Sequence, residues 1–141
     1  MSKNLVFIAS GGRTGSMFLG ERLGRVIEDC WSEHEPDMFA GFTSVTLGRL
    51  RRFGLKHMVV DRLLGRSGVR VLGQGLLSGR IPETECLRRI RDGRRRYHER
   101  IPESLVIESY YSWWVFASRI DRLWPGAKMV GVIRDPRIWI E

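Results

Sequence analysis

The first part of the chain, residues 5–27, constrains the fold most strongly. Residues 5–9 are apolar or small, a glycine-rich stretch follows at 11–16, and apolar positions with helical spacing come next. This pattern predicts a buried strand, a tight loop and a helix that begins at the loop. We expect one face of that helix to carry Phe18, Leu19, Leu23, Val26 and Ile27. Such a loop points backbone N–H groups at one spot beside the positive end of a helix dipole, so its natural occupant is an anion, most often phosphate.

Composition narrows the class of protein. The chain has 141 residues, the size of one domain, and we expect a single domain over residues 1–141. Its net charge of +8 favours acidic partners such as nucleotides, nucleic acid, anionic lipid, or sulfated and phosphorylated ligands. Cys30 and Cys86 show neither metal-site spacing nor a disulfide framework, which predicts no bound metal and a reducing compartment. The apolar start is shorter than the ~20 residues of a membrane span and lacks a secretory signal, so we expect no transmembrane segment and a cytoplasmic location.

The middle of the chain is polar and basic, and its elements are harder to predict. Pro36 biases the preceding residue away from helix, so residues 30–37 are predicted as a loop or strand end. Residues 45–64 are typical of one or two helices broken near Gly54. The glycine-rich segment 65–79 predicts a short strand or a mobile loop.

A helix is predicted after Pro82, which suits the first turn of a helix and is followed by Glu83 and Glu85. This helix runs to about Arg100 and has an expected buried face of Cys86, Leu87, Ile90 and Tyr97. Its expected outer face consists of Arg88, Arg89, Arg91, Arg94, Arg95 and Arg96.

The last part of the chain returns to alternating strands and helices. Residues 105–107 predict a buried strand, 113–123 a helix that ends at Trp124-Pro125-Gly126, and 128–133 a second buried strand. Strand, helix and strand with short connections favour a right-handed crossover in a parallel sheet. Ligands bind at the carboxyl ends of parallel strands. If the first and last strands are neighbours, Arg13 and Arg134 face one crevice, which suits a ligand with two separated anionic groups.

Two segments resemble motifs of the sulfotransferases that use 3′-phosphoadenosine 5′-phosphosulfate (PAPS). Residues 12–19 are similar to the 5′-phosphosulfate loop of that family, and residues 124–137 to its 3′-phosphate segment. His34-Glu35-Pro36 sits where many bacterial and carbohydrate-type members place a loop with an acidic residue. The resemblance implies an α/β fold, with a parallel sheet flanked by helices in a P-loop-like nucleotide-binding architecture. It also implies sulfuryl transfer from PAPS to a hydroxyl or amine of a carbohydrate, lipid or small-molecule acceptor.

The resemblance also implies roles for individual residues. Arg13 would contact the 5′-phosphosulfate and stabilise charge on the leaving phosphate, and Arg134 would bind the 3′-phosphate. Hydroxyl and backbone N–H donors of the loop would come from Thr14, Gly15, Ser16 and Met17. The acceptor hydroxyl needs a base, for which Glu35 is the first candidate and His34 the second. Glu108, near the end of the strand at 105–107, is a further candidate for a ligand contact.

The chain departs from the family pattern at three places. Met17 replaces a serine or threonine, and Arg13 stands where many members have lysine, which keeps the charge but changes the geometry. A serine that the family places after the arginine matched by Arg134 falls beyond Glu141. We therefore expect this chain to correspond to the first portion, or to a short member, of a larger fold.

Two other functions are open at this level. A P-loop NTPase or kinase needs a lysine and a hydroxyl residue after the last loop glycine. Here Gly15 is followed by Ser16-Met17, and the missing lysine disfavours this function. A basic module could bind nucleic acid or another polyanion through the arginines of residues 88–96. A solvated helix face explains those arginines more simply, and we do not expect a nucleic-acid partner.

Overall fold

A computed structural model describes residues 3–11, 15–39, 41, 43–135 and 137 of the chain. Contacts divide the chain into two compact units, which we describe separately. The sheet unit comprises Met1–Glu35 and Glu103–Glu141, and the helical unit comprises Pro36–Pro102. The predicted α/β class is confirmed, whereas the single-domain organisation stays a prediction.

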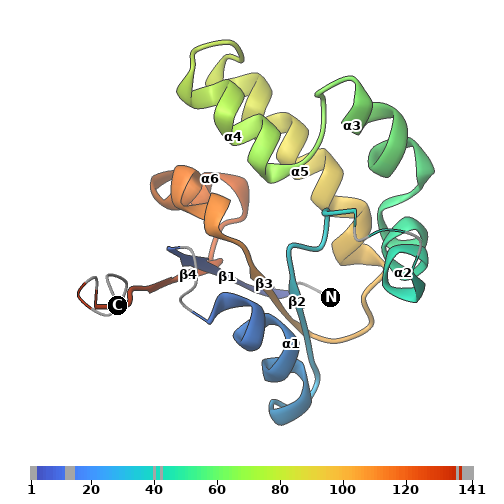
Figure 1. Cartoon of the computed structure of the whole chain (residues 1–141), viewed down its shortest axis with the longest axis vertical. Helices are drawn as coiled ribbons and strands as arrows, with labels where there is room; N and C mark the ends of the chain where they lie inside the picture. The colour runs from blue at the N-terminus through green and yellow to red at the C-terminus, as the bar shows by residue number, and fades with distance from the viewer. Residues whose placement is uncertain (1–2, 12–14, 40, 42, 136, 138–141) are drawn as a thin grey trace. The chain divides into compact units, whose positions relative to one another are not determined.

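The described residues of the sheet unit form a four-stranded parallel sheet in the order β2-β3-β1-β4 (Figure 1). The strands are β1 (Asn4–Ser10), β2 (Cys30–His34), β3 (Leu105–Ser109) and β4 (Lys128–Val132). Strand β1 lies between β3 and β4, with Ser10 opposite Val132. The parallel sheet was predicted from sequence, and the structure meets the condition that the first and last strands are neighbours.

Helix α1 (Ser16–Val26) covers one face of the sheet (Figure 1). Its Leu19 and Leu23 pack against Ile8 and other core residues of that face. Gly20 brings the helix backbone against β2, because a Cβ added there would lie 2.8 Å from the Cβ of His34. Close glycine packing therefore fixes which side of α1 meets the sheet.

The expected apolar face of α1 was only partly right. Phe18 and Val26 are exposed, at 63% and 76%, and Ile27 is also exposed. The glycine contact turns the side of Leu19 and Leu23 inward and leaves the side of Phe18 in solvent. Val26 and Ile27 lie at the C-terminal end of α1.

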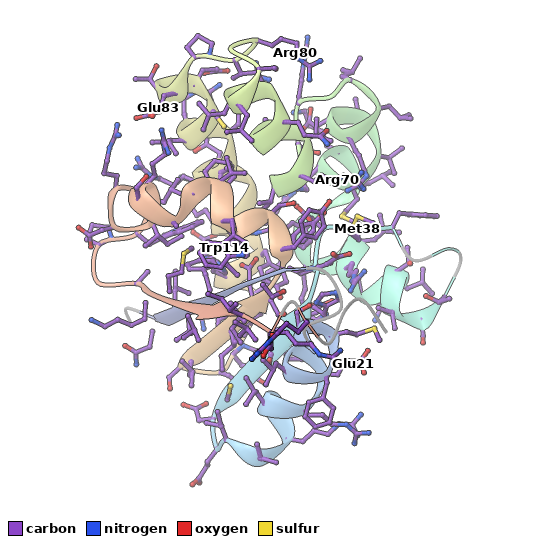
Figure 2. All side chains as sticks on the ribbon, turned by 60° about the vertical axis from the view of Figure 1, so that its left-hand side comes forward. Glu21, Met38, Arg70, Arg80, Glu83 and Trp114 are labelled. Atoms are coloured by element: carbon purple, nitrogen blue, oxygen red, sulfur yellow. The ribbon has the colours of Figure 1, made fainter. Side chains whose placement is uncertain are left out.

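The opposite face of the sheet packs against an aromatic cluster. Phe7 contacts Trp113 edge-on at 4.5 Å and stacks on Trp124 at 4.8 Å between ring centroids. These tryptophans belong to, or directly follow, the segment made of the 3₁₀-helix η2 (Tyr111–Arg119) and α6 (Ile120–Leu123). Trp114, labelled in Figure 2, is half-exposed and lies against Gly131 of β4. The helix predicted for residues 113–123 is therefore mostly a 3₁₀-helix.

Two strand predictions need correction. Strand β4 was expected to be buried, but Val130 is 46% exposed because β4 lies at the edge of the sheet. Residues 30–34 form strand β2, although a loop or strand end was expected over 30–37. This polar segment lacks a strand pattern of its own. It forms a strand because it pairs with β3, where Cys30 lies opposite Leu105. The strand ends before Glu35, whose φ of 46° is left-handed.

The helical unit contains α2 (Ser44–Phe53), the π-helix η1 (Lys56–Val60), α3 (Asp61–Leu63), α4 (Val69–Leu77) and α5 (Glu83–Glu99). The break at Gly54, where φ is 86°, and the helix after Pro82 were predicted. The strand or mobile loop expected around residues 69–72 is wrong, because this segment is helix α4. The carboxylate of Asp37 accepts the N–H of Val69 at 2.9 Å and so caps α4 from a distant part of the chain.

A buried ion pair organises the helical unit and corrects one expected surface residue. Arg94 was placed on the outer face of α5, but it is only 2% exposed. Its Nη2 lies 3.2 Å from Oδ2 of Asp37, and its guanidinium lies 5.0 Å from the ring centre of Phe53. Phe53 in turn stacks on Tyr97 at 4.5 Å. The predicted inward residues of α5, including Tyr97, are buried as expected.

Candidate functional site

The start of α1 offers backbone donors at the carboxyl edge of the sheet. Gly15 precedes the helix in a left-handed conformation, with φ of 87°. The first bond of the helix runs from the N–H of Leu19 to the carbonyl of Gly15 at 3.0 Å, so helix geometry leaves residues 16–18 without an intrahelical acceptor. In the described residues, this first turn contains neither an acidic residue nor a side-chain cap. The helix terminus thus has the character of an anion site.

The predicted loop residues are only partly placed. Arg13 and Thr14 lie outside the described residues. Gly15 and Met17 are exposed, and Ser16 is half-buried. Met17, at 59% exposure, contributes little to the core.

Ser109, at the end of β3, interacts with three residues at the carboxyl ends of the strands. Its Oγ donates to the carbonyl of Ser16 at 2.6 Å, and Nδ1 of His34 lies 3.3 Å from the same oxygen. The carbonyl of Ser109 accepts the N–H of Glu35 at 2.9 Å. Sequence reasoning missed this residue. No local signal marks it, because Glu108 separates Ser109 from the apolar run 105–107 and its contacts come from distant parts of the chain.

His34 and Glu35, the two candidate bases, lie beside each other. Nε2 of His34 is 3.7 Å from Oε1 of Glu35, and both side chains are 21% exposed. The hydroxyl of Ser109 points its hydrogen at Ser16, so the hydrogen-bond network assigns the proton of neutral His34 to Nδ1. The nitrogen that can take up a proton therefore faces Glu35. This arrangement can accept a proton and keep it between an imidazole and a carboxylate.

Ser10 adds a buried polar atom at the same edge. It is 1% exposed, and its Oγ has no hydrogen-bond partner among the residues that the structure describes. An unsatisfied buried hydroxyl costs about 1–3 kcal/mol, which a ligand oxygen would offset. Sequence reasoning treated Ser10 only as the residue that leads into the loop.

Arg134 follows directly on the neighbouring strand. Strand β4 ends at Val132, opposite Ser10, and Arg134 comes two residues later with an exposed side chain. The turn is held by Asp135, which accepts the N–H of Arg137 at 3.0 Å and its Nη2 at 2.6 Å. Hydrogen bonds from the Arg137 side chain lower the pKa of Asp135. The second predicted anion contact therefore starts from the same sheet edge as the glycine loop.

Glu108 does not join this group. It is fully buried in β3 and lies opposite Phe7 in the register. Successive residues of a strand point to opposite faces, so its side chain lies on the face away from Ser109.

No cluster of three or more His, Cys, Asp or Glu side chains suited to a metal ion occurs in the described part of the chain. None of the helices described there is long and apolar enough to cross a membrane. Comparisons with protein-family models, with curated proteins and with solved structures found no match. Function is therefore inferred from the residues and geometry of the chain itself.

Proposed function

We propose that the chain binds PAPS at the carboxyl edge of its sheet and transfers the sulfuryl group to a hydroxyl or amine. The acceptor would be a carbohydrate, a lipid or a small molecule. The observation that carries the proposal is the parallel pairing of β1 with β4, with Ser10 opposite Val132. Because of this pairing, the loop after β1 and the Arg134 segment after β4 start from adjacent positions. A nucleotide with phosphates at both its 5′ and 3′ positions matches two such anion contacts.

The 5′-phosphosulfate would bind at the start of α1. Arg13 and the N–H groups of residues 16–18 would face the oxygens of the phosphate that leaves, where negative charge develops. The buried hydroxyl of Ser10, which has no hydrogen-bond partner among the described residues, would be a further donor. Arg134 would hold the 3′-phosphate and so fix the position of the reacting group.

The chemical step is an in-line displacement at sulfur. The acceptor oxygen or nitrogen forms a bond to sulfur while the bond between sulfur and the 5′-phosphate oxygen breaks. The proton of the acceptor passes to Glu35, or to His34 beside it, and 3′-phosphoadenosine 5′-phosphate leaves. Ser109 supports this step indirectly, because its hydroxyl fixes the imidazole and its carbonyl holds the backbone of Glu35.

Thermal unfolding with 3′-phosphoadenosine 5′-phosphate tests the proposal. A ligand that binds only the folded state raises the melting temperature, and we expect a saturable increase. Arg13→Ala and Arg134→Ala should each abolish most of it, while Arg25→Ala, an exposed arginine in the last turn of α1, should keep it. Absence of an increase at millimolar nucleotide would contradict the proposal. So would a magnesium-dependent increase with ATP that survives Arg134→Ala, since that behaviour belongs to a P-loop NTPase.

A further inference from the structure

The helical unit contains a pocket of its own, independent of the proposed nucleotide site. Its volume is about 470 Å³, within the range of small-ligand sites. The walls come from the end of α2, from residues 56–67 and from α5, whose first residue, Glu83, is labelled in Figure 2. All of its lining residues belong to the helical unit.

The charges that line the pocket do not balance. Five cationic and three acidic side chains line it, so two positive charges are left over. Lys56 is paired with Asp61 at 3.1 Å, and Arg88 is paired with Glu85 at 2.8 Å and with Asp92 at 3.0 Å.

The remaining pairs identify the two uncompensated cations. Arg89 also binds Glu85, at 2.7 Å, and hydrogen bonds from Arg88 and Arg89 lower the pKa of Glu85 to about 2. The side chains of Arg66 and Arg96 have no hydrogen bond or ion pair within the described residues.

Part of the pocket lining is aromatic and uncharged. The ring of His57 stacks on Phe53 at 5.0 Å. Burial, with Arg94 as the next cause, lowers the pKa of His57 to about 4, so the imidazole is neutral at pH 7. Gly93 makes room for this ring, since a Cβ added there would lie 2.5 Å from Cε1 of His57. The pocket thus combines two unpaired guanidinium groups with a flat, neutral surface.

We infer that this pocket binds the phosphate group of a small phosphate monoester through Arg66 and Arg96. Guanidinium groups match phosphate oxygens in geometry, and two of them balance a dianion. The volume exceeds what an inorganic anion needs, and the half-buried ring of His57 in the pocket lining offers a surface to the organic part of the ester. Both arginines are exposed, so binding should weaken as the salt concentration rises.

Titration of the whole chain followed by NMR tests this inference. The Hε1 signal of His57, assigned through His57→Gln, reports on the pocket wall. We expect phenyl phosphate to shift this signal saturably, and inorganic phosphate to do so more weakly. The double variant Arg66→Gln/Arg96→Gln should weaken phenyl phosphate binding at least about tenfold. Arg95→Gln should leave it unchanged, because Arg95 is an exposed arginine of the same helix outside the pocket.

Three results would overturn the inference. The first is no shift beyond that caused by sodium chloride at equal ionic strength. The second is an equal loss of affinity with Arg95→Gln and with the double variant, which would indicate diffuse charge attraction. The third is equal affinity for inorganic phosphate and phenyl phosphate, which would exclude the ester. Arg134→Ala should not change the His57 shift, so failure here is distinguishable from failure of the proposed nucleotide site.

Discussion

Mild acid should destabilise the helical unit through His57. Burial, reinforced by Arg94 and Arg62, lowers the pKa of this histidine from 6.5 to about 4, against the opposing effects of Asp37 and Asp61. Its Nε2 is buried without a hydrogen-bond partner in the described part of the chain. A proton bound there would place an unsolvated positive charge near Arg94.

The direction of the effect follows from proton binding. Between pH 6.5 and 4 the unfolded chain carries a proton on His57 that the folded chain lacks, so the free energy of unfolding falls as the pH drops. The stabilising contribution of the neutral His57 side chain is fully present above pH 6.5 and is lost as the pH falls to about 4. At about 1.36 kcal/mol for each pH unit between the two pKa values, the whole effect is about 3 kcal/mol. About 2 kcal/mol of it is lost between pH 7 and pH 5.

Urea unfolding of the native chain and of His57→Gln at pH 7 and pH 5 measures this contribution. Most other groups titrate alike in both proteins, so their contributions cancel in the comparison. The native chain should lose about 2 kcal/mol more than the variant between the two pH values. Equal losses in both proteins, or an NMR titration that gives His57 a pKa near 6.5, would refute the reasoning.

Three further predictions test the packing and the site. Arg94→Met removes the cation in contact with the buried carboxylate of Asp37 and leaves the charge of Arg62 nearby. It should lower the free energy of unfolding by about 3–5 kcal/mol in urea; a loss below about 1 kcal/mol contradicts the ion pair. Gly20→Ala places a Cβ 2.8 Å from β2 and should lower the free energy of unfolding by about 1–3 kcal/mol. The control Gly48→Ala meets only a flexible side chain and should stabilise α2 by up to about 1 kcal/mol. Equal effects of the two substitutions on unfolding would contradict the close contact between α1 and β2. Met17→Ser should tighten binding of 3′-phosphoadenosine 5′-phosphate about two- to tenfold by calorimetry, and unchanged affinity would exclude a phosphate at the start of α1.

The elements that were predictable from sequence are those whose signals are local. The segment from β1 to α1 combines an apolar run, a glycine loop and apolar residues at helical spacing. Helix α5 combines Pro82 with acidic residues in its first turn. In both cases hydrophobic period and end signals agree, so neighbouring residues suffice to specify the structure. The adjacency of β1 and β4 was a conditional prediction, because pairing order depends on contacts across the whole chain.

The elements that were not predictable depend on distant partners. The segment of α4 reads as a loop because it is rich in glycine, yet Asp37 caps its first turn and Gly75 packs closely on Ile81. Arg94 shares the helical spacing of the buried residues of α5, but its charge argued for solvent until the carboxylate of Asp37 was placed beside it.

The candidate site divides in the same way. The loop and the Arg134 segment could be found as motifs, because each is a contiguous run of residues. The contact between His34 and Glu35 follows from their being neighbours in the chain. Ser109 could not be found as a positioning residue, since its role depends on the pairing of β2 with β3 and on the packing of α1.

The most direct test of the central proposal compares two nucleotides that differ only in the 3′-phosphate. Calorimetry should show that the native chain binds 3′-phosphoadenosine 5′-phosphate at least about tenfold more tightly than adenosine 5′-monophosphate, because Arg134 contacts the additional phosphate. Arg134→Ala should bind both nucleotides with the same affinity, and Arg25→Ala should retain the native preference. Equal affinities in the native chain, or a preference that persists in Arg134→Ala, would contradict the two-anion site.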